Sequence, residues 1–212
     1  MSEALIPIFP LGIVPLPGEP VPLHIFEPRY KQMVSDCAPR PGSNGYLPIG
    51  INFSKENHLH EVGCTVVIHQ VLHKYADGQL DLMTLGTQRY RLLNMHEDQP
   101  YLKAEVLFLN DHDPAEQPEP ALKETVLAGF SEFLKLIGSD SEVEAPEQGL
   151  SFHLASLLSL EVEARLVLIE LQSENERLQK LADYLAELLP RLQKAHEFKR
   201  RVRSNGHFKP KS

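Results

Sequence analysis

Six prolines fall within the first 22 residues and constrain the fold of this chain more than any other feature. Proline fixes the backbone angle φ and has no N–H group to donate to a sheet, so it favours edge strands, strand starts and turns. The apolar segments between the prolines are therefore expected to form short edge strands, with a turn at Pro17-Gly18. The prolines are Pro7, Pro10, Pro15, Pro17, Pro20 and Pro22.

A helix is expected to begin at Pro28. Proline suits the first helical position, and the carboxylate of Glu27 complements the exposed N–H groups of a helix start. The apolar residues that follow recur at helical spacing, which predicts one buried face. They are Tyr30, Met33, Val34 and Cys37.

Residues 46–109 show the period-two alternation of β-strands. We expect a strand at 46–53, a polar connection at 54–61 and a hairpin at 64–86 that turns at Asp77-Gly78. Gly86 is expected to mark a bulge or bend, and the strands continue to residue 109. About six short strands with glycine and proline corners predict a small closed or partly closed β-barrel.

Beyond an acidic, proline-bearing linker at 110–120, apolar residues recur at the spacing of helices. Gly138 is expected to end the first of these helices, because glycine readily adopts the left-handed conformation found there. Ser159 is expected to cap a later helix. Ser173, with Glu176 three residues on, has the capping-box pattern and is expected to cap the last one.

A leucine seam at 178–192 predicts the core of a helical bundle, with a dimer or partner surface as the alternative. Pro190 lies within it and predicts a kink or a new helix start. The chain is therefore expected to be α+β, a small β-barrel followed by a C-terminal helical bundle. The expected parts are a barrel with one inserted helix at 1–115, an α-helical half at 119–203 and a disordered basic tail at 204–212.

The run PIFPLGIVPLPGEPVPLHIFEPRY at 7–30 resembles the opening signature of the N-terminal domain of Lon ATP-dependent proteases. The Gly-x-x-Arg-aromatic run at 86–90 and the Leu-Ser-Leu-Glu segment at 158–161 fit the same family. This domain also occurs as short stand-alone bacterial proteins and as a module of cereblon. The resemblance implies a PUA-like barrel, as found in pseudouridine synthase and archaeosine transglycosylase domains, and a LON substrate-binding domain that helps to recognise substrates.

The net charge of −8 is unevenly spread. Residues 1–193 hold 14 Lys and Arg against 28 Asp and Glu, a net charge of −14, whereas residues 194–212 hold 7 against 1, a net charge of +6. The body should repel nucleic acid, and only the tail could attract it. The start shows no secretory signal, no apolar run approaches the length of a membrane helix, and two cysteines give no disulfide framework. A cytoplasmic protein is expected.

Five residues are candidates for peptide binding. Glu27, Arg29 and Tyr30 place a carboxylate, a guanidinium and a phenol beside the proline-rich segment. Arg89 and Arg91, two apart on one strand, could grip a carboxylate or phosphate. The alternative is structural: Glu27 caps the helix, Arg29 makes a surface pair and Tyr30 packs into the barrel. Both strand arginines would then be solvated or paired with nearby acids.

No metal, cofactor or catalytic residue is expected. The histidines at 58, 60, 69 and 73 lack the spacing of a metal motif, and Cys37 on an apolar helix face should be inert. The chain has no G-x-x-x-x-G-K-[ST] run and no room for the nucleotide-binding and Ser-Lys modules that Lon proteolysis needs. We therefore expect a protein that is not an enzyme.

The predicted function is a non-catalytic protein-recognition module or adaptor that binds unfolded or apolar segments of other proteins, without ATP. An ATP-dependent protease is a further candidate partner, and the protein is expected to be a monomer or dimer. The alternative is a nucleic-acid-binding protein that uses the barrel and the basic tail. A small-molecule site in a groove rests only on the general tendency of clefts to bind ligands.

Overall fold

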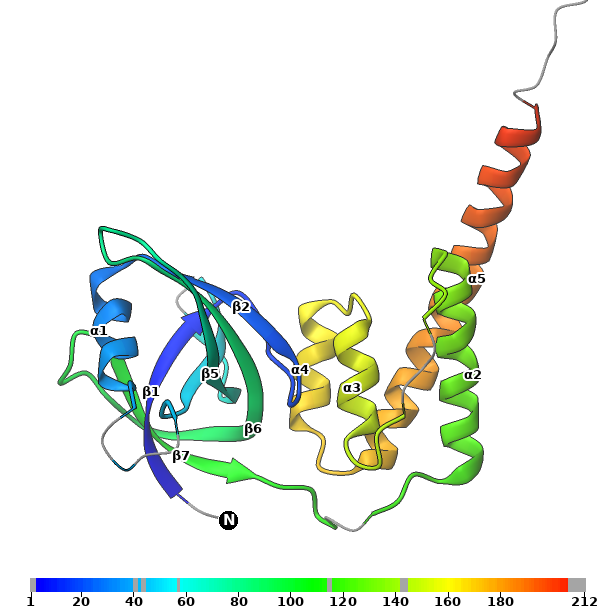
Figure 1. The fold of residues 1–212 in the computed structure, drawn as a ribbon. Helices are drawn as coiled ribbons and strands as arrows, with labels where there is room; N and C mark the ends of the chain where they lie inside the picture. Colours follow the sequence, from blue (N-terminus) through cyan, green and yellow to red (C-terminus); the bar gives the residue numbers. More distant parts are fainter. Residues whose placement is uncertain are drawn as a thin grey trace, which may run out of the picture. The chain divides into compact units, whose positions relative to one another are not determined.

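The structure, a computed structural model, describes residues 3–39, 42, 45–56, 58–113, 116–141 and 145–205. For residues 199–205 it describes the backbone alone. Strands fill the first part of the chain and helices the last, so the predicted α+β class is confirmed (Figure 1). In the described part, no helix is both long and apolar enough to cross a membrane.

Five strands close into a barrel. The hydrogen-bonded order is β1-β7-β6-β5-β3, and a parallel pairing of β1 with β3 returns the sheet to its first strand. Closure leaves these strands without the long open edges that invite uncontrolled pairing. The strands are β1 (Glu3–Leu11), β2 (Pro20–Ile25), β3 (Ile49–Lys55), β4 (His58–Leu59), β5 (Val62–Lys74), β6 (Leu80–His96) and β7 (Leu102–Leu109).

The prolines of β1 lie in a strand that is paired on both sides, so the prediction of a short edge strand was wrong here. Residues 3–8 pair antiparallel with β7, and residues 8–11 pair parallel with β3. Pro7 lies opposite a residue of β7 and Pro10 opposite a residue of β3. Strand β1 changes its pairing partner between Pro7 and Pro10. Each of the neighbouring strands, β7 and β3, therefore lies opposite only one proline. The shorter β2, whose only strand partner among the described residues is β6, fits the edge prediction.

The β5–β6 hairpin confirms the predicted turn, where Gly78 has a φ of 80°. A register shift separates the Cys64–Arg89 and Val66–Gly86 pairs, as expected for a bulge near Gly86. The connection predicted at 54–61 was wrong in part, because residues 54 and 55 pair with residues 58 and 59 in the small β3–β4 hairpin.

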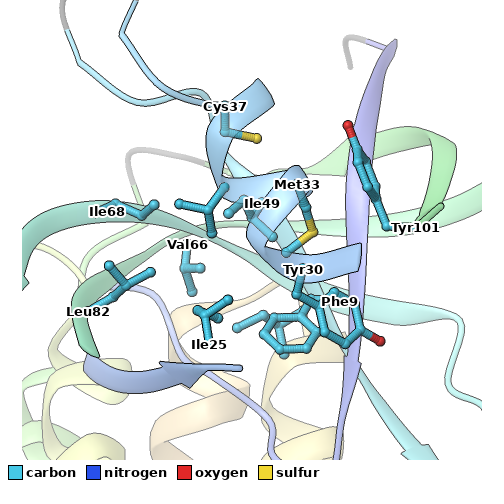
Figure 2. Close-up of a cluster of buried hydrophobic side chains, with 12 residues drawn as sticks. Phe9, Ile25, Tyr30, Met33, Cys37, Ile49, Val66, Ile68, Leu82 and Tyr101 are labelled. Carbon is cyan, nitrogen blue, oxygen red and sulfur yellow. The ribbon is translucent and has the colours of Figure 1, made fainter. Parts of the chain in front are cut away.

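Helix α1 (Pro28–Asp36) buries the predicted face against the barrel (Figure 2). Tyr30 packs against Phe9 of β1, with ring centroids 4.1 Å apart. Met33 is fully buried, and Cys37, at the C-terminal end of the helix, is 3% exposed. The helix therefore closes one end of a core formed with residues of β1, β2, β3, β5 and β6.

Contacts divide the chain into two compact units. The first lies within Met1–Pro114 and Phe152–Gln172, and the second within Ala115–Ser151 and Ser173–Ser212. This division differs from the domain boundaries expected from the sequence, because residues 152–172 group with the barrel and not with the other helices. The division falls inside α3 (Leu150–Leu157), and α4 (Val162–Glu170) belongs wholly to the barrel unit.

The second unit is built on α2 (Pro120–Ile137) and α5 (Glu174–Asn205). These helices run in the same direction, since Glu119 binds Asn175 near one end and Gln193 binds Glu132 further along. Gly138 ends α2 with a φ of 79°, as predicted. Within the seam of α5, Leu178, Leu181 and Leu185 are at most 2% exposed and form part of a helical core.

Two predicted helix starts had different outcomes. Ser173 caps α5 as expected, because its Oγ accepts a hydrogen bond from the backbone N–H of Glu176 at 3.2 Å. The cap of α4 was predicted at Ser159, but the N-cap residue is Glu161. Helix α5 continues through Pro190 to Asn205. Of the tail predicted at 204–212, residues 206–212 lie outside the described residues.

Candidate functional site

The outward side of the three-stranded sheet β2–β6–β5 is the candidate functional surface. Three rows of paired residues cross these strands, and we call them together the outer sheet face. The rows are Pro20–Leu85–Val67, Pro22–Met83–Gln70 and His24–Asp81–His73. Because strand side chains alternate between the two sides of a sheet, the residues that β2 and β6 contribute to these rows share one side, and the residues between them on these two strands face the core. On β5 two register shifts interrupt the alternation, and the residues at 69–72 are exposed.

Burial separates the two sides clearly. On the inner side, Val21, Leu82 and Thr84 are at most 6% exposed. On the outer side, Leu85 is 37% exposed, Met83 is half-buried and both prolines of β2 are exposed. Five of the six residues in the first two rows are therefore apolar, the exception being Gln70, and exposed apolar residues that lie side by side are typical of an interaction site.

The third row forms a polar, aromatic end to the face. Asp81 accepts a hydrogen bond from the hydroxyl of Tyr75 at 2.7 Å and lies 2.6 Å from Nδ1 of His24. These hydrogen bonds, that to His24 foremost, hold the pKa of Asp81 below its usual range. The ring of Phe26, 56% exposed, stacks on His24 at 5.8 Å between centroids. A ligand chain could find both apolar and polar contacts at this end.

A pocket of about 300 Å³ adjoins the other end of the face. It shares Pro20 and Pro22 with the outer sheet face, and residues 12–15 and the start of α4 complete its walls. All of these residues belong to the barrel unit. The shared prolines make the pocket and the face one continuous surface.

An ion pair joins the two segments that form the wall of this pocket. Nη1 and Nη2 of Arg165 donate to the Glu19 carboxylate at 2.8 and 2.7 Å. Nη1 also donates to the carbonyl oxygen of Val14, and the N–H of Leu16 donates to Glu19. Bidentate pairs of this type fix geometry as well as charge, so α4 and the proline-rich segment are held together at the pocket.

The predicted candidates Glu27, Arg29 and Tyr30 lie together at the start of α1. Nε of Arg29 donates to Glu27 at 2.8 Å, and the guanidinium lies over the Tyr30 ring, 4.6 Å from its centroid. Glu27 occupies the N-cap position, but its side chain makes no capping hydrogen bond. Tyr30 is buried, and burial raises the pKa of its hydroxyl. Glu27 directly follows Phe26, which lies at the polar end of the outer sheet face, and Arg29 is paired with Glu27.

The two strand arginines have different surroundings. Arg89 is 4% exposed; it donates to the backbone carbonyls of Ile169 and Leu171 and to Asp111, and its guanidinium lies 5.3 Å from the Phe152 ring centroid. It therefore joins β6 to the segment 152–172 inside the barrel unit. Arg91 is exposed and pairs with Glu61 at 3.1 Å. The structure does not bring either arginine to the start of α1.

The cysteines and histidines in the described part of the chain show no arrangement for metal chemistry. Within the described residues, no three His, Cys, Asp or Glu side chains form a group that could hold a metal ion. Burial raises the pKa of the Cys37 thiol to about 11 and that of Cys64 to about 12, so both are poor nucleophiles near neutral pH.

The family model described as the ATP-dependent protease La (LON) substrate-binding domain matches residues 5–187. The chain belongs to this family. The LON substrate-binding domain is the matched module, and it is distinct from the catalytic domain of the protease. The resemblance seen in the proline-rich opening is thereby confirmed.

Full-length relatives of this LON domain are named Lon proteases. The chain is 27% identical over 212 residues to Lon protease 2 of Syntrophobacter fumaroxidans, covering 93% of this chain and 26% of that protein. It is 29% identical over 154 residues to Lon protease 2 of Herpetosiphon aurantiacus, covering 69% and 19%. The chain thus spans about a quarter or less of the length of these relatives.

Solved structures agree on the LON fold. The Lon N-terminal domain protein from Xanthomonas campestris is 26% identical, with a TM-score of 0.65 over 85% of this chain and 98% of that one. The N-terminal domain of the Mycobacterium avium complex Lon protease has a TM-score of 0.60 over 88% of this chain and all of that one. At 18% identity, the second supports the fold alone.

The outer sheet face was not predicted from the sequence, although the alternation of residues along β6 gives a signal for it. Leu80, Leu82 and Thr84 of LON-domain strand β6 predict one side of the strand, and this is the inner side. On the other side, Asp81 is polar but Met83 and Leu85 are apolar, which is unusual for a side expected to face water. A strand that is apolar on both sides could have pointed to this surface.

Proposed function

We propose that this LON domain is a non-catalytic recognition module that holds exposed apolar segments of other proteins on the outer sheet face. The observation that carries the proposal is the group of five apolar residues in the rows Pro20–Leu85–Val67 and Pro22–Met83–Gln70, which lie on the outward side of a barrel sheet. An extended segment could lay alternate side chains across these rows. Its other side chains would face solvent.

Aromatic and charged side chains at the edge of this face would set the direction in which a bound segment lies. Phe26 supplies a large exposed ring, and Glu27 and Arg29 beside it offer charges to the ends of a bound segment. Aromatic and arginine side chains are enriched in protein interfaces. Glu27 and Arg29 are accordingly proposed as secondary contacts, and the apolar residues of the two rows as the main ones.

A link to proteolysis is part of the proposal. The family is that of the substrate-binding domain of an ATP-dependent protease, and the relatives quoted above are named Lon proteases. We infer that segments held on the outer sheet face belong to proteins destined for an ATP-dependent protease, with this chain acting as recognition module or adaptor. No ATP would be needed for the binding step itself.

The test is binding of a fluorescent, reduced and alkylated, permanently unfolded protein. The double variant Met83→Ser/Leu85→Ser should weaken binding about tenfold or more, because two apolar contacts are lost. Leu93→Ser is the matched control, since Leu93 lies on the same strand and is 44% exposed but lies outside the outer sheet face. Equal binding by the wild type and the double variant would refute the proposal. Retention of RNA but no unfolded protein would favour the nucleic-acid alternative instead.

A further inference from the structure

The pocket beside the outer sheet face has the size and lining of a subsite for one side chain. Its volume of about 300 Å³ is at the small end of ligand pockets. Val14, Leu160 and Val162 give it apolar walls, and the shared prolines connect it to the face. Its two charged lining residues, Glu19 and Arg165, are paired with each other. The interior therefore suits an apolar group better than a charged one.

The two segments that line the pocket carry an excess of negative charge. Glu161 and Glu163 flank the lining residue Val162, and both are exposed. In the segments 12–22 and 160–165, which line the pocket, the charged residues are Glu19, Glu161, Glu163 and Arg165, a net charge of −2. A positively charged group near the mouth would be attracted, and a negatively charged one repelled.

We propose that this pocket binds one bulky apolar side chain of a client segment, and that basic residues next to that side chain lie against Glu161 and Glu163. The inference rests on the proposed function, since the rest of the segment would lie on the outer sheet face. It adds a preference for clients: an apolar anchor beside lysine or arginine should be held more tightly than the same anchor beside acids.

Gly12 offers a direct way to fill the pocket. It lines the pocket, a Cβ atom at this position would meet nothing within 4 Å, and its φ lies outside the left-handed region. Gly12→Phe should therefore place a ring in or over the pocket at little cost to folding. The probe is a fluorescent peptide with a leucine-serine stretch for the outer sheet face, followed by a phenylalanine between lysines. Matched peptides carry serine for the phenylalanine, or glutamates for the lysines.

We expect Gly12→Phe to weaken binding of the phenylalanine peptide about tenfold, to the level of the serine peptide, and to leave the serine peptide unaffected. Glu161→Gln/Glu163→Gln should weaken binding of the lysine-flanked peptide about threefold to tenfold and bring it closer to the glutamate-flanked one. Glu161 makes no side-chain capping bond, so its neutralisation leaves the cap of α4 intact. Glu97→Gln/Asp98→Asn makes the same change of charge elsewhere on the barrel unit and should have no effect.

The outcomes separate this inference from the proposed function. Wild-type affinity of Gly12→Phe for the phenylalanine peptide, with binding lost in Met83→Ser/Leu85→Ser, would overturn the pocket assignment and leave the recognition role in place. Equal affinity for lysine- and glutamate-flanked peptides would overturn the charge preference. If the wild type bound none of the peptides, both the pocket assignment and the recognition role would fall.

Discussion

Arg165 and Glu19, 146 residues apart in the chain, form a bidentate ion pair whose side chains are only 16% and 15% exposed. Removing the guanidinium would leave a carboxylate and the Val14 carbonyl short of partners in a mostly buried position. Arg165→Met should therefore lower the free energy of unfolding by about 2–4 kcal/mol. Chemical denaturation measures this.

Arg29→Met provides the control for that experiment. Arg29 also pairs with a glutamate, but its side chain is 51% exposed. Exposed pairs contribute little, so the change should stay within about 0.5 kcal/mol. Similar losses in the two variants would mean that the Arg165 pair is no more important than a surface contact.

Arg89 and Arg91 differ by two positions on β6, and we expect very different effects of their loss. Arg89→Met leaves the carbonyls of Ile169 and Leu171 and the carboxylate of Asp111 without their guanidinium, which should cost about 3–5 kcal/mol. Arg91→Met should change stability by less than about 0.5 kcal/mol. Hydrogen exchange should report faster opening of α4 in the Arg89 variant alone. Unchanged exchange in α4 would contradict the role assigned to Arg89.

Gly86 lies so close to the segment 16–19 that a Cβ atom would overlap the carbonyl oxygen of Leu16. Its own N–H donates to the carbonyl of Glu19 at 2.8 Å, and its carbonyl accepts from Gly18 at 2.9 Å. Gly86→Ala must therefore displace backbone, and should lower the free energy of unfolding by about 3 kcal/mol. Gly12→Ala, which meets open space, should be nearly neutral. Thermal unfolding of the two variants side by side tests the difference.

Stability should fall as the pH rises above about 9. Burial raises the pKa of Cys37 from 9.0 to about 11 and that of Cys64 from 9.0 to about 12, so the folded thiols stay protonated where the unfolded ones lose their protons. The unfolded state then binds fewer protons, and rising pH favours it. The two thiols together should remove about 3 kcal/mol between about pH 8 and 10.

Cys37→Ala/Cys64→Ala tests this source of the pH dependence. The double variant should show a much flatter decline between pH 8 and 10 in urea denaturation, whatever its stability at pH 7. Burial also raises the pKa of the hydroxyls of Tyr30, Tyr90 and Tyr101, so a decline above about pH 10 should persist in the variant. An unaltered slope in the double variant would exclude the thiols as its cause.

Local patterns predicted those elements that local physics determines. Tyr30 and Met33 recur at helical spacing and lie on the buried face of α1. Asp77-Gly78 supplies the left-handed residue that the hairpin turn needs, and Ser173 caps α5 through its own hydroxyl. Each of these features depends on residues within a few positions of one another, so the sequence alone contains the information.

Other features depend on residues that are distant in the sequence. Nothing near Arg89 shows that 152–172 will cover it, so its alternation with Arg91 predicts two equivalent arginines. The outer sheet face likewise arises from three strands whose register aligns Pro22 with Met83 and Met83 with Gln70. Tertiary contacts decide which side of a two-sided apolar strand is buried, and a single strand cannot reveal it.

The pairing of β1 with β7 also determines when the barrel can close during synthesis of the chain. Strand β1 leaves the ribosome before β7, with which its residues 3–8 pair and whose last residue is Leu109. At synthesis rates of about 5–20 residues per second, that partner follows about 5–20 s later. Throughout this interval, the apolar first strand has no β7 to pair with. A nascent chain of this protein is thus itself, for some seconds, an exposed apolar segment.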